Sequence, residues 1–270
     1  HTPTRRQRQM CIRDRLMTEL WSMNIKDDPL NFVKFVFEWG KEGTPLENFT
    51  GPRKWQEKIL RDIGIHIQRN QSVDLPEMFR LAVASGRGIG KSALVSWLIL
   101  WMLSTRLGST IIVTANTEQQ LRSRTWAELG KWLTLAINSH WFNKTATTIR
   151  PAQWFEEALI RDLKIDTGYY YAQAQLWSEE NPDAFAGIHS SYGVCLIMDE
   201  ASGIPAPIYS VLRDFSQNRQ PIGIGSRFLT PEGILGRFTT LFTANARTGI
   251  RNKSTHAQSK AQIKSYSNKC

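Results

Sequence analysis

Residues 85–92 (SGRGIGKS) follow the phosphate-binding pattern GxxxxGK[ST], with serine in place of the first glycine. Glycines let backbone N–H groups turn towards phosphate oxygens, and the amino end of the following helix adds positive potential. Lys91 would contact the β- and γ-phosphates of ATP, Ser92 would offer its hydroxyl to Mg²⁺, and Arg87 would reach the γ-phosphate. Such turns also occur without a ligand, but a dinucleotide fingerprint starting at Gly86 fails because its third glycine position is Lys91. The glycines expected around the phosphates are Gly86, Gly88 and Gly90.

An acidic pair follows an apolar segment further along the chain. Residues 194–198 read VCLIM and run directly into Asp199 and Glu200. An apolar strand ending in Asp-Glu is typical of a Walker B motif, in which Asp199 would hold Mg²⁺ and Glu200 would orient and activate the attacking water. Adjacent carboxylates also occur as solvated turn residues. A glutamate beside a phosphate loop favours hydrolysis over passive nucleotide binding.

Trp55 and Gln56 lie upstream of the glycine-rich segment, on a helix predicted by the spacing of apolar residues in 54–65. A glutamine amide can donate to and accept from adenine, and an indole can stack on the base, so this pair is a candidate adenine site. The alternative is that Trp55 belongs to the core and Gln56 is exposed. The five histidines show no ligand spacing and are interpreted as structural or surface residues, and the three cysteines predict neither a disulfide framework nor a zinc site.

The elements that position these residues predict an α/β fold. Apolar segments without alternation predict strands buried on both faces, and helical segments lie between them, so we expect a parallel sheet with helices on both faces. Residues 31–39 predict only a buried element, either helix or strand. The longest apolar segment is too short for the roughly 20 residues of a membrane span. The predicted strands are 79–84, 110–114 and 194–198, with 220–224 as a further candidate, and the predicted helices are 91–103 and 117–136, the latter capped by Asn116 or Thr117.

The net charge of +10 arises entirely from the two ends of the chain. Residues 1–15 hold five arginines and one aspartate, and residues 244–270 hold six basic and no acidic residues, which leaves 23 of each sign in 16–243. The total charge is therefore no evidence for a DNA-binding core. We interpret 1–15 as a non-native or disordered basic segment, because MCIRDR resembles translated adapter sequence, with a DNA-binding arm as the alternative. The other expected divisions are an N-terminal helical extension (16–70) with the adenine-contacting pair, an ATPase core (71–243) and a basic tail or truncated linker (244–270).

With these motifs in place, residues 51–207 resemble the ATPase domain of the large subunit of tailed-bacteriophage terminases. Beyond the two nucleotide motifs, the resemblance includes VTANT at 113–117 with Gln120, WSE at 177–179 and FAGIH at 185–189. It implies a P-loop NTPase fold of the ASCE, RecA-like type, with ATP and Mg²⁺ as cofactors. It also implies that ATP hydrolysis drives double-stranded DNA into a procapsid.

Similarity to this family further implies partners and a location. The partners would be double-stranded viral DNA, a portal protein, a small terminase subunit and further copies of the chain in a ring, in the bacterial host cytoplasm and transiently docked on the procapsid. An arginine would reach a neighbour's phosphate; Arg122 and Arg124 are candidates, and the alternative places both on a solvated helix surface. Residues 224–228 (IGSRF) depart from the family's coupling motif. No acidic residue follows Glu232, so we expect no nuclease activity, which needs a carboxylate cluster.

Two other functions would use the same motifs. A helicase-like or remodelling ATPase would share the pocket but would need a second RecA-like lobe, for which residues 206–270 are too few. A defective prophage remnant would bind nucleotide without turnover. Strand separation would indicate the first, and tight ATP binding without hydrolysis would indicate the second.

Overall fold

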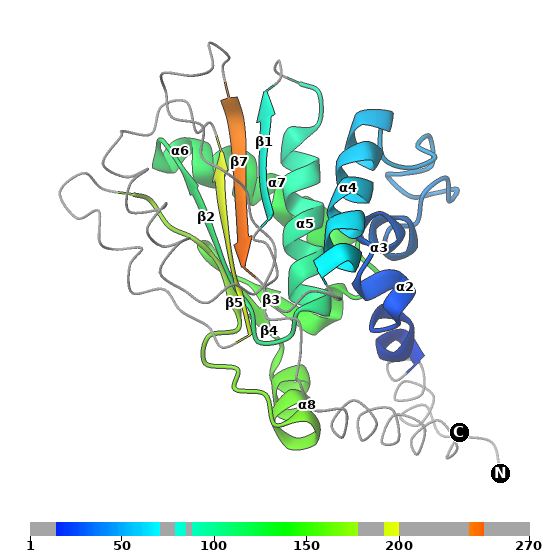
Figure 1. Cartoon of the computed structure of the whole chain (residues 1–270), viewed down its shortest axis with the longest axis vertical. Coiled ribbons are helices and arrows are strands. Elements are labelled where there is room, and N and C mark those ends of the chain that lie inside the picture. Colours follow the sequence, from blue (N-terminus) through cyan, green and yellow to red (C-terminus); the bar gives the residue numbers. More distant parts are fainter. Residues whose placement is uncertain (1–14, 71–78, 85–87, 178–191, 200–237, 246–270) are drawn as a thin grey trace.

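The computed structural model describes residues 15–70, 79–84, 88–177, 192–199 and 238–245, which form an α/β fold (Figure 1). The strands are β1 (Phe79–Ala84), β2 (Thr110–Ala115), β3 (Phe142–Lys144), β4 (Thr148–Pro151), β5 (Tyr171–Ala174), β6 (Val194–Asp199) and β7 (Phe238–Asn245). The helices are α2 (Met23–Lys26), α3 (Pro29–Val36), α4 (Lys54–Asn70), α5 (Lys91–Thr105), α6 (Glu118–Gln120), the π-helix η1 (Leu121–Trp126), α7 (Ala127–Leu135), the 3-10 helix η2 (Ser139–Trp141) and α8 (Gln153–Leu163). No helix in these ranges is long and apolar enough to span a bilayer.

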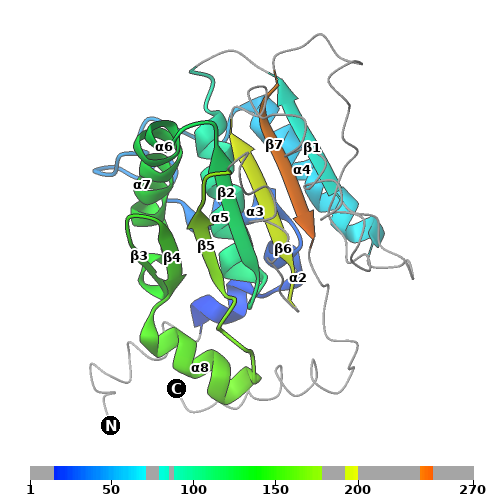
Figure 2. The ribbon, with the colours of Figure 1, turned by 90° about the vertical axis from the view of Figure 1, so that its left-hand side faces the viewer.

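The described strands form one sheet in the order β1-β7-β6-β2-β5-β4-β3. Strand β2 pairs in parallel with both β5 and β6, and all six residues of β2 are buried. Burial of successive side chains means that both faces of β2 are covered, as predicted. The predictions of strands at 79–84, 110–114 and 194–198 are confirmed. Helical cover is seen on one face, where α3, α4 and α5 lie in Figures 1 and 2.

The sheet is mixed, which corrects the prediction of a parallel sheet. Strand β7 lies between β1 and β6 and runs antiparallel to both, and β4 runs antiparallel to β3 and β5. A continuous apolar segment indicates a strand buried on both faces but carries no information on strand direction. Strands β3 and β4 are joined by only three residues, which permits antiparallel pairing alone. The candidate strand at 220–224 lies outside the described residues.

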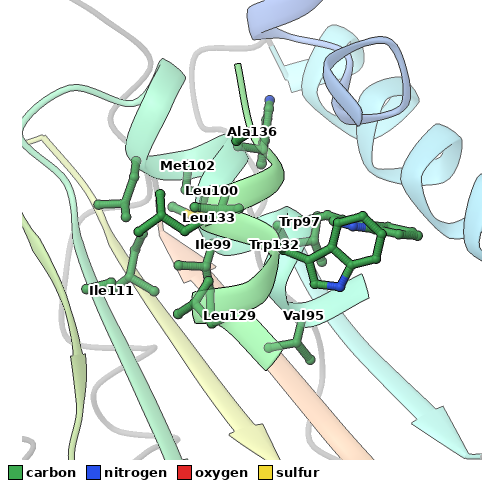
Figure 3. Packing of buried hydrophobic residues seen from close by; sticks show 14 of the residues in the cluster. Val95, Trp97, Ile99, Leu100, Met102, Ile111, Leu129, Trp132, Leu133 and Ala136 are labelled. Atoms are coloured by element: carbon green, nitrogen blue, oxygen red, sulfur yellow. The ribbon is translucent and has the colours of Figure 1, made fainter. Parts of the chain in front are cut away.

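Helix α5 forms the centre of the core. Residues 93–105 are all buried, the pattern of a helix that other elements surround on every side. Figure 3 shows Trp97 of α5 beside Trp132 of α7, with Leu129 of α7 near Ile111 of β2. The rings of Trp97 and Trp132 meet edge to face with centroids 4.9 Å apart, a geometry that aromatic pairs prefer. The helix predicted at 91–103 is confirmed and extends to Thr105.

The helix predicted at 117–136 is present but interrupted. Thr117 caps its start, since the threonine side chain accepts a hydrogen bond from the backbone N–H of Gln120 at 3.2 Å. The short α6 passes into the π-helix η1 before α-helical geometry resumes in α7. A π-turn occurs mostly as a single turn within an α-helix, frequently at functional sites, and hydrophobic periodicity does not predict it.

The N-terminal helices pack into the same core as α5. The undecided segment 31–39 is helical as far as Val36, in a helix whose start is capped by the carboxylate of Asp28. The helix predicted at 54–65 is confirmed and continues to Asn70. The indole N–H of Trp101 in α5 donates to the carbonyl of Lys26 in α2 at 3.0 Å, which ties the two helices together.

A buried ion pair joins the end of α2 to the end of α5. The Arg106 guanidinium lies 2.9 Å from Oδ1 of Asp27, and both side chains are less than a tenth exposed. Burial lowers the pKa of Arg106, and the neighbouring Asp27 carboxylate acts in the opposite direction. Arg106 also lies over the Trp101 ring, 5.1 Å from its centroid. The guanidinium is therefore held in the core by one carboxylate and one aromatic face.

Replacing Asp27 with alanine leaves the Arg106 guanidinium buried without its carboxylate. Because breaking one side of a buried pair is strongly destabilising, we expect the free energy of unfolding to fall by about 3–5 kcal/mol in urea denaturation. Asp62→Ala is the matched control, since Lys58 and Asp62 form an exposed pair on α4, and its expected cost is below about 1 kcal/mol. Equal losses in the two variants would show that the buried pair contributes no more to stability than the exposed one.

Candidate functional site

The carboxyl ends of strands β1, β2 and β6 lie level with each other at one edge of the sheet. Asp199 of β6 pairs with Ala115 of β2 and with Thr240 of β7, and Thr240 pairs on its other side with Val83 of β1. Neighbouring strands lie about 4.8 Å apart, so the backbones of Val83 and Asp199 are about 10 Å apart across β7. In α/β proteins, ligands bind outside the carboxyl ends of the parallel strands. This edge is therefore the expected place for a ligand.

The glycine-rich segment follows β1, which ends at this edge, and precedes α5 in the chain. Within its described part, Gly88 and Gly90 adopt φ values of 75° and 93°. Only glycine occupies this region without strain, which explains the residue type at both positions. Gly90 is the N-cap of α5, so Lys91 and Ser92 lie in the first helical turn. Backbone N–H groups in a first turn lack helical partners and can bind an anion.

Gln56 braces this turn from α4. Its side-chain Nε2 donates to the carbonyl of Gly90 at 2.8 Å, and its Oε1 accepts from the backbone N–H of Arg53 at 2.8 Å. The Arg53 guanidinium donates to the carbonyl of Ile89 at 3.0 Å. Gln56 is 2% exposed, so the alternative of an exposed glutamine is wrong. Its amide is engaged with backbone groups of the protein, and adenine recognition by Gln56 stays a prediction.

On the other side of the edge, Thr125 holds the carboxylate of Asp199. The threonine hydroxyl Oγ1 donates a hydrogen bond to Oδ2 of Asp199 at 2.5 Å. Thr125 lies on η1 and is fully buried. Sequence analysis missed this residue, since a threonine within a predicted helix gives no sign of a partner 74 residues away.

The oxygen ligands expected for Mg²⁺ are the Ser92 hydroxyl and the Asp199 carboxylate, and both residues are half-buried. Mg²⁺ prefers oxygen ligands and is usually held by one or two carboxylates together with substrate phosphates, so this donor set suits a magnesium–nucleotide complex. Among the described residues, no three His, Cys, Asp or Glu side chains gather as a metal site. Gly86, Arg87 and Glu200 lie outside the described residues, and their roles stay predictions.

Trp55 and the two candidate arginines have the following surroundings. Trp55 is partly buried and packs against the core. Its stacking on adenine stays a prediction. Arg122 is half exposed and forms an ion pair with Glu118 at 2.7 Å. Arg124 is exposed and lines a polar surface pocket with Gln120. Both arginines lie on the helix surface, as the alternative interpretation expected.

The described histidines and cysteine have structural surroundings. The His66 ring lies 2.6 Å from the amide nitrogen of Asn70, and His140 stacks on Trp154 with ring centroids 5.8 Å apart. Cys195 is a free buried thiol, and burial raises its pKa, which disfavours a reactive thiolate. These residues therefore have no part in the candidate site.

No protein-family model matches this chain, and no curated protein is significantly similar to it in sequence. The resemblance to terminase large subunits accordingly depends on the motifs of the chain itself. The geometry adds that the carboxyl ends of β1 and β6 lie at one edge of the sheet.

Gly90→Ala tests the close approach of Gln56 to the turn. A Cβ at position 90 would lie 3.0 Å from Nε2 of Gln56, and the alanine would have to adopt a φ of +93°. We expect the free energy of unfolding in urea to fall by about 2–3 kcal/mol, because left-handed strain and crowding add together. Gly43→Ala is the matched control, with a φ of +75° and no atom within 4 Å of its Cβ. It should lose only the strain component, about 1 kcal/mol.

The contact between Gln56 and Gly90 predicts that substitutions at these two positions have coupled effects on stability. Once Gln56→Ala has removed the crowding partner and the hydrogen bond to Gly90, the further cost of Gly90→Ala should shrink. We expect the double variant to lose less stability than the sum of the single variants, by at least about 0.5 kcal/mol. Additive losses would contradict the bracing contact.

Proposed function

We propose that this chain is a Mg²⁺-dependent ATP hydrolase with a P-loop NTPase fold of the RecA-like type. One observation carries the proposal: Val83, just before the glycine-rich segment, and Asp199 pair with the same residue, Thr240. The two motifs that the sequence assigns to phosphate and to metal therefore leave the sheet at one edge. Ligands of α/β proteins bind at this edge, outside the carboxyl ends of the strands, which supports a single site for phosphate and metal.

In this proposal, each candidate residue has one task. Lys91 supplies positive charge to the β- and γ-phosphates, beside the N–H groups of the first turn of α5, and Arg87 contacts the γ-phosphate. Ser92 and Asp199 would hold Mg²⁺, which would supply positive charge to neutralise the charge that develops on the phosphates. Glu200 orients the attacking water and accepts its proton.

We further propose that hydrolysis moves double-stranded DNA, as the resemblance of residues 51–207 to terminase large subunits implies. The partners would be viral DNA, a portal protein, a small terminase subunit and further copies of the chain in a ring on the procapsid, in the host cytoplasm. Arg122 and Arg124 are exposed, which is compatible with reaching the nucleotide of a neighbouring copy. DNA stimulation of hydrolysis and DNA movement into a procapsid are the activities that test this part.

Lys91→Ala removes the cation that the proposal assigns to the phosphates. We expect the rate of phosphate release from Mg·ATP by the full chain, measured with and without double-stranded DNA, to fall roughly 10²- to 10³-fold. Lys58→Ala is the control, because Lys58 is 77% exposed on α4 and should be dispensable. Equal rates for Lys91→Ala and the wild type, with DNA and partner proteins present, would contradict the proposal.

Glu200→Gln separates hydrolysis from passive binding, because a carboxamide keeps the volume of the side chain but cannot accept the proton of water. Turnover should fall at least about 10²-fold while fluorescent ATP still binds. If the wild type itself bound ATP without any turnover in the presence of DNA and partners, a non-enzymatic remnant would be the better description. Strand separation by the wild type would instead favour the helicase-like alternative.

A further inference from the structure

One polar side chain interrupts the buried face of η1 and α7. The buried residues of these two elements are Leu121, Thr125, Trp126, Leu129, Trp132 and Leu133. Burying a hydroxyl in an apolar environment costs free energy unless it is hydrogen-bonded. A threonine on this face therefore needs a partner, and its partner is the carboxylate of Asp199.

The hydrogen bond constrains one oxygen of Asp199. Thr125 is fully buried, whereas Asp199 is half-buried at the strand end, so the contact runs from the core towards the edge of the sheet. The distance between Oγ1 and Oδ2 is 2.5 Å, at the short end of the range for a hydroxyl–oxygen hydrogen bond. The β-branched side chain of Thr125 also has few rotamers, which limits how the hydroxyl can move.

The π-helical turn that carries Thr125 is anchored on both sides of that residue. Leu121 is 2% exposed, and the indole N–H of Trp126 donates to the carbonyl of Thr145 at 3.2 Å. Adjacent residues thus contact two different parts of the fold, Asp199 on β6 and the turn between β3 and β4. A π-turn frequently marks a functional site, and here it holds the donor against the candidate metal ligand.

We propose that Thr125 is the positioning residue for Asp199 and orients its carboxylate for a divalent metal bound with nucleotide. The inference rests on the proposed function, since that function assigns Asp199 to the metal. Groups that hydrogen-bond to a metal ligand fix its orientation, and their loss typically costs 10- to 100-fold in metal affinity or activity. Thr125 therefore acts through Asp199 and needs no contact with the nucleotide.

Direct metal binding tests this role without relying on turnover. Mn²⁺ is titrated into the full chain with a non-hydrolysable ATP analogue, and free Mn²⁺ is measured by electron paramagnetic resonance. Thr125→Val keeps the branched shape and removes the donor, so the dissociation constant for Mn²⁺ should rise about 10- to 100-fold. Thr125→Ser keeps the donor and should return the constant to within about threefold of the wild-type value. Thr125→Ala is a second variant without the hydroxyl, in case valine prevents folding.

Thr105→Val is the matched control for loss of a buried threonine hydroxyl. The hydroxyl of Thr105 donates to the carbonyl of Trp101 at 2.7 Å, at the opposite end of α5 from the candidate site. We expect this variant to bind Mn²⁺ like the wild type. Melting temperatures of all variants separate a general loss of stability from a specific loss of metal affinity.

The outcomes distinguish this inference from the proposed function. If Asp199→Ala loses Mn²⁺ binding while the two Thr125 variants without a hydroxyl keep it within about twofold, the positioning role is wrong and the function stands. A failure of serine to restore affinity also overturns the positioning role. If both Lys91→Ala and Asp199→Ala bind Mn²⁺ and nucleotide like the wild type, the proposed function is wrong and the role of Thr125 falls with it.

Discussion

The structure depends on burying helix α5 around its whole circumference. No face of residues 93–105 can turn to solvent without exposing apolar surface, at about 25 cal/mol for each Å². The helix therefore has one stable place, among the sheet, the N-terminal helices and α7. Because Lys91 and Ser92 are its first residues, the location of the candidate phosphate site follows from the packing of the core. The contacts of Gln56 then adjust the turn that precedes the helix.

Elements with continuous apolar composition could be predicted from the sequence, but their directions in the sheet could not. Strands β2 and β6 and helix α5 occur within a few residues of their predicted bounds, since local composition determines that such segments are buried. Strand β7 lies antiparallel between β1 and β6 through long-range pairing that no local pattern specifies. Strands β3 and β4 are only three and four residues long, too short for a periodicity to be detected.

For the candidate site too, some residues could be predicted from the sequence and others could not. Lys91, Ser92 and Asp199 could be proposed from sequence because phosphate and metal chemistry restrict residue type and order. Gln56 drew attention for its amide, but the contact seen is with the carbonyl of Gly90, 34 residues away. Thr125 could not be found, since its role depends on a π-turn and a distant strand end meeting in space. Residues that contact a ligand can be recognised from sequence motifs. Residues that position them through long-range contacts can be recognised only from the structure.

The place of β7 in the sheet has a consequence for synthesis on the ribosome. Strands β1 and β6 form no hydrogen bonds with each other in the described sheet, and β7 joins them although it follows both in the chain. Polypeptides emerge from the amino end, so β1, α5 and β6 leave the exit tunnel before residues 238–245 are available. In the described sheet β6 is paired to β2, whereas β1 pairs only with β7 and so lacks a strand partner until β7 is available. The edge of the sheet at which the glycine-rich segment begins is therefore completed last during synthesis.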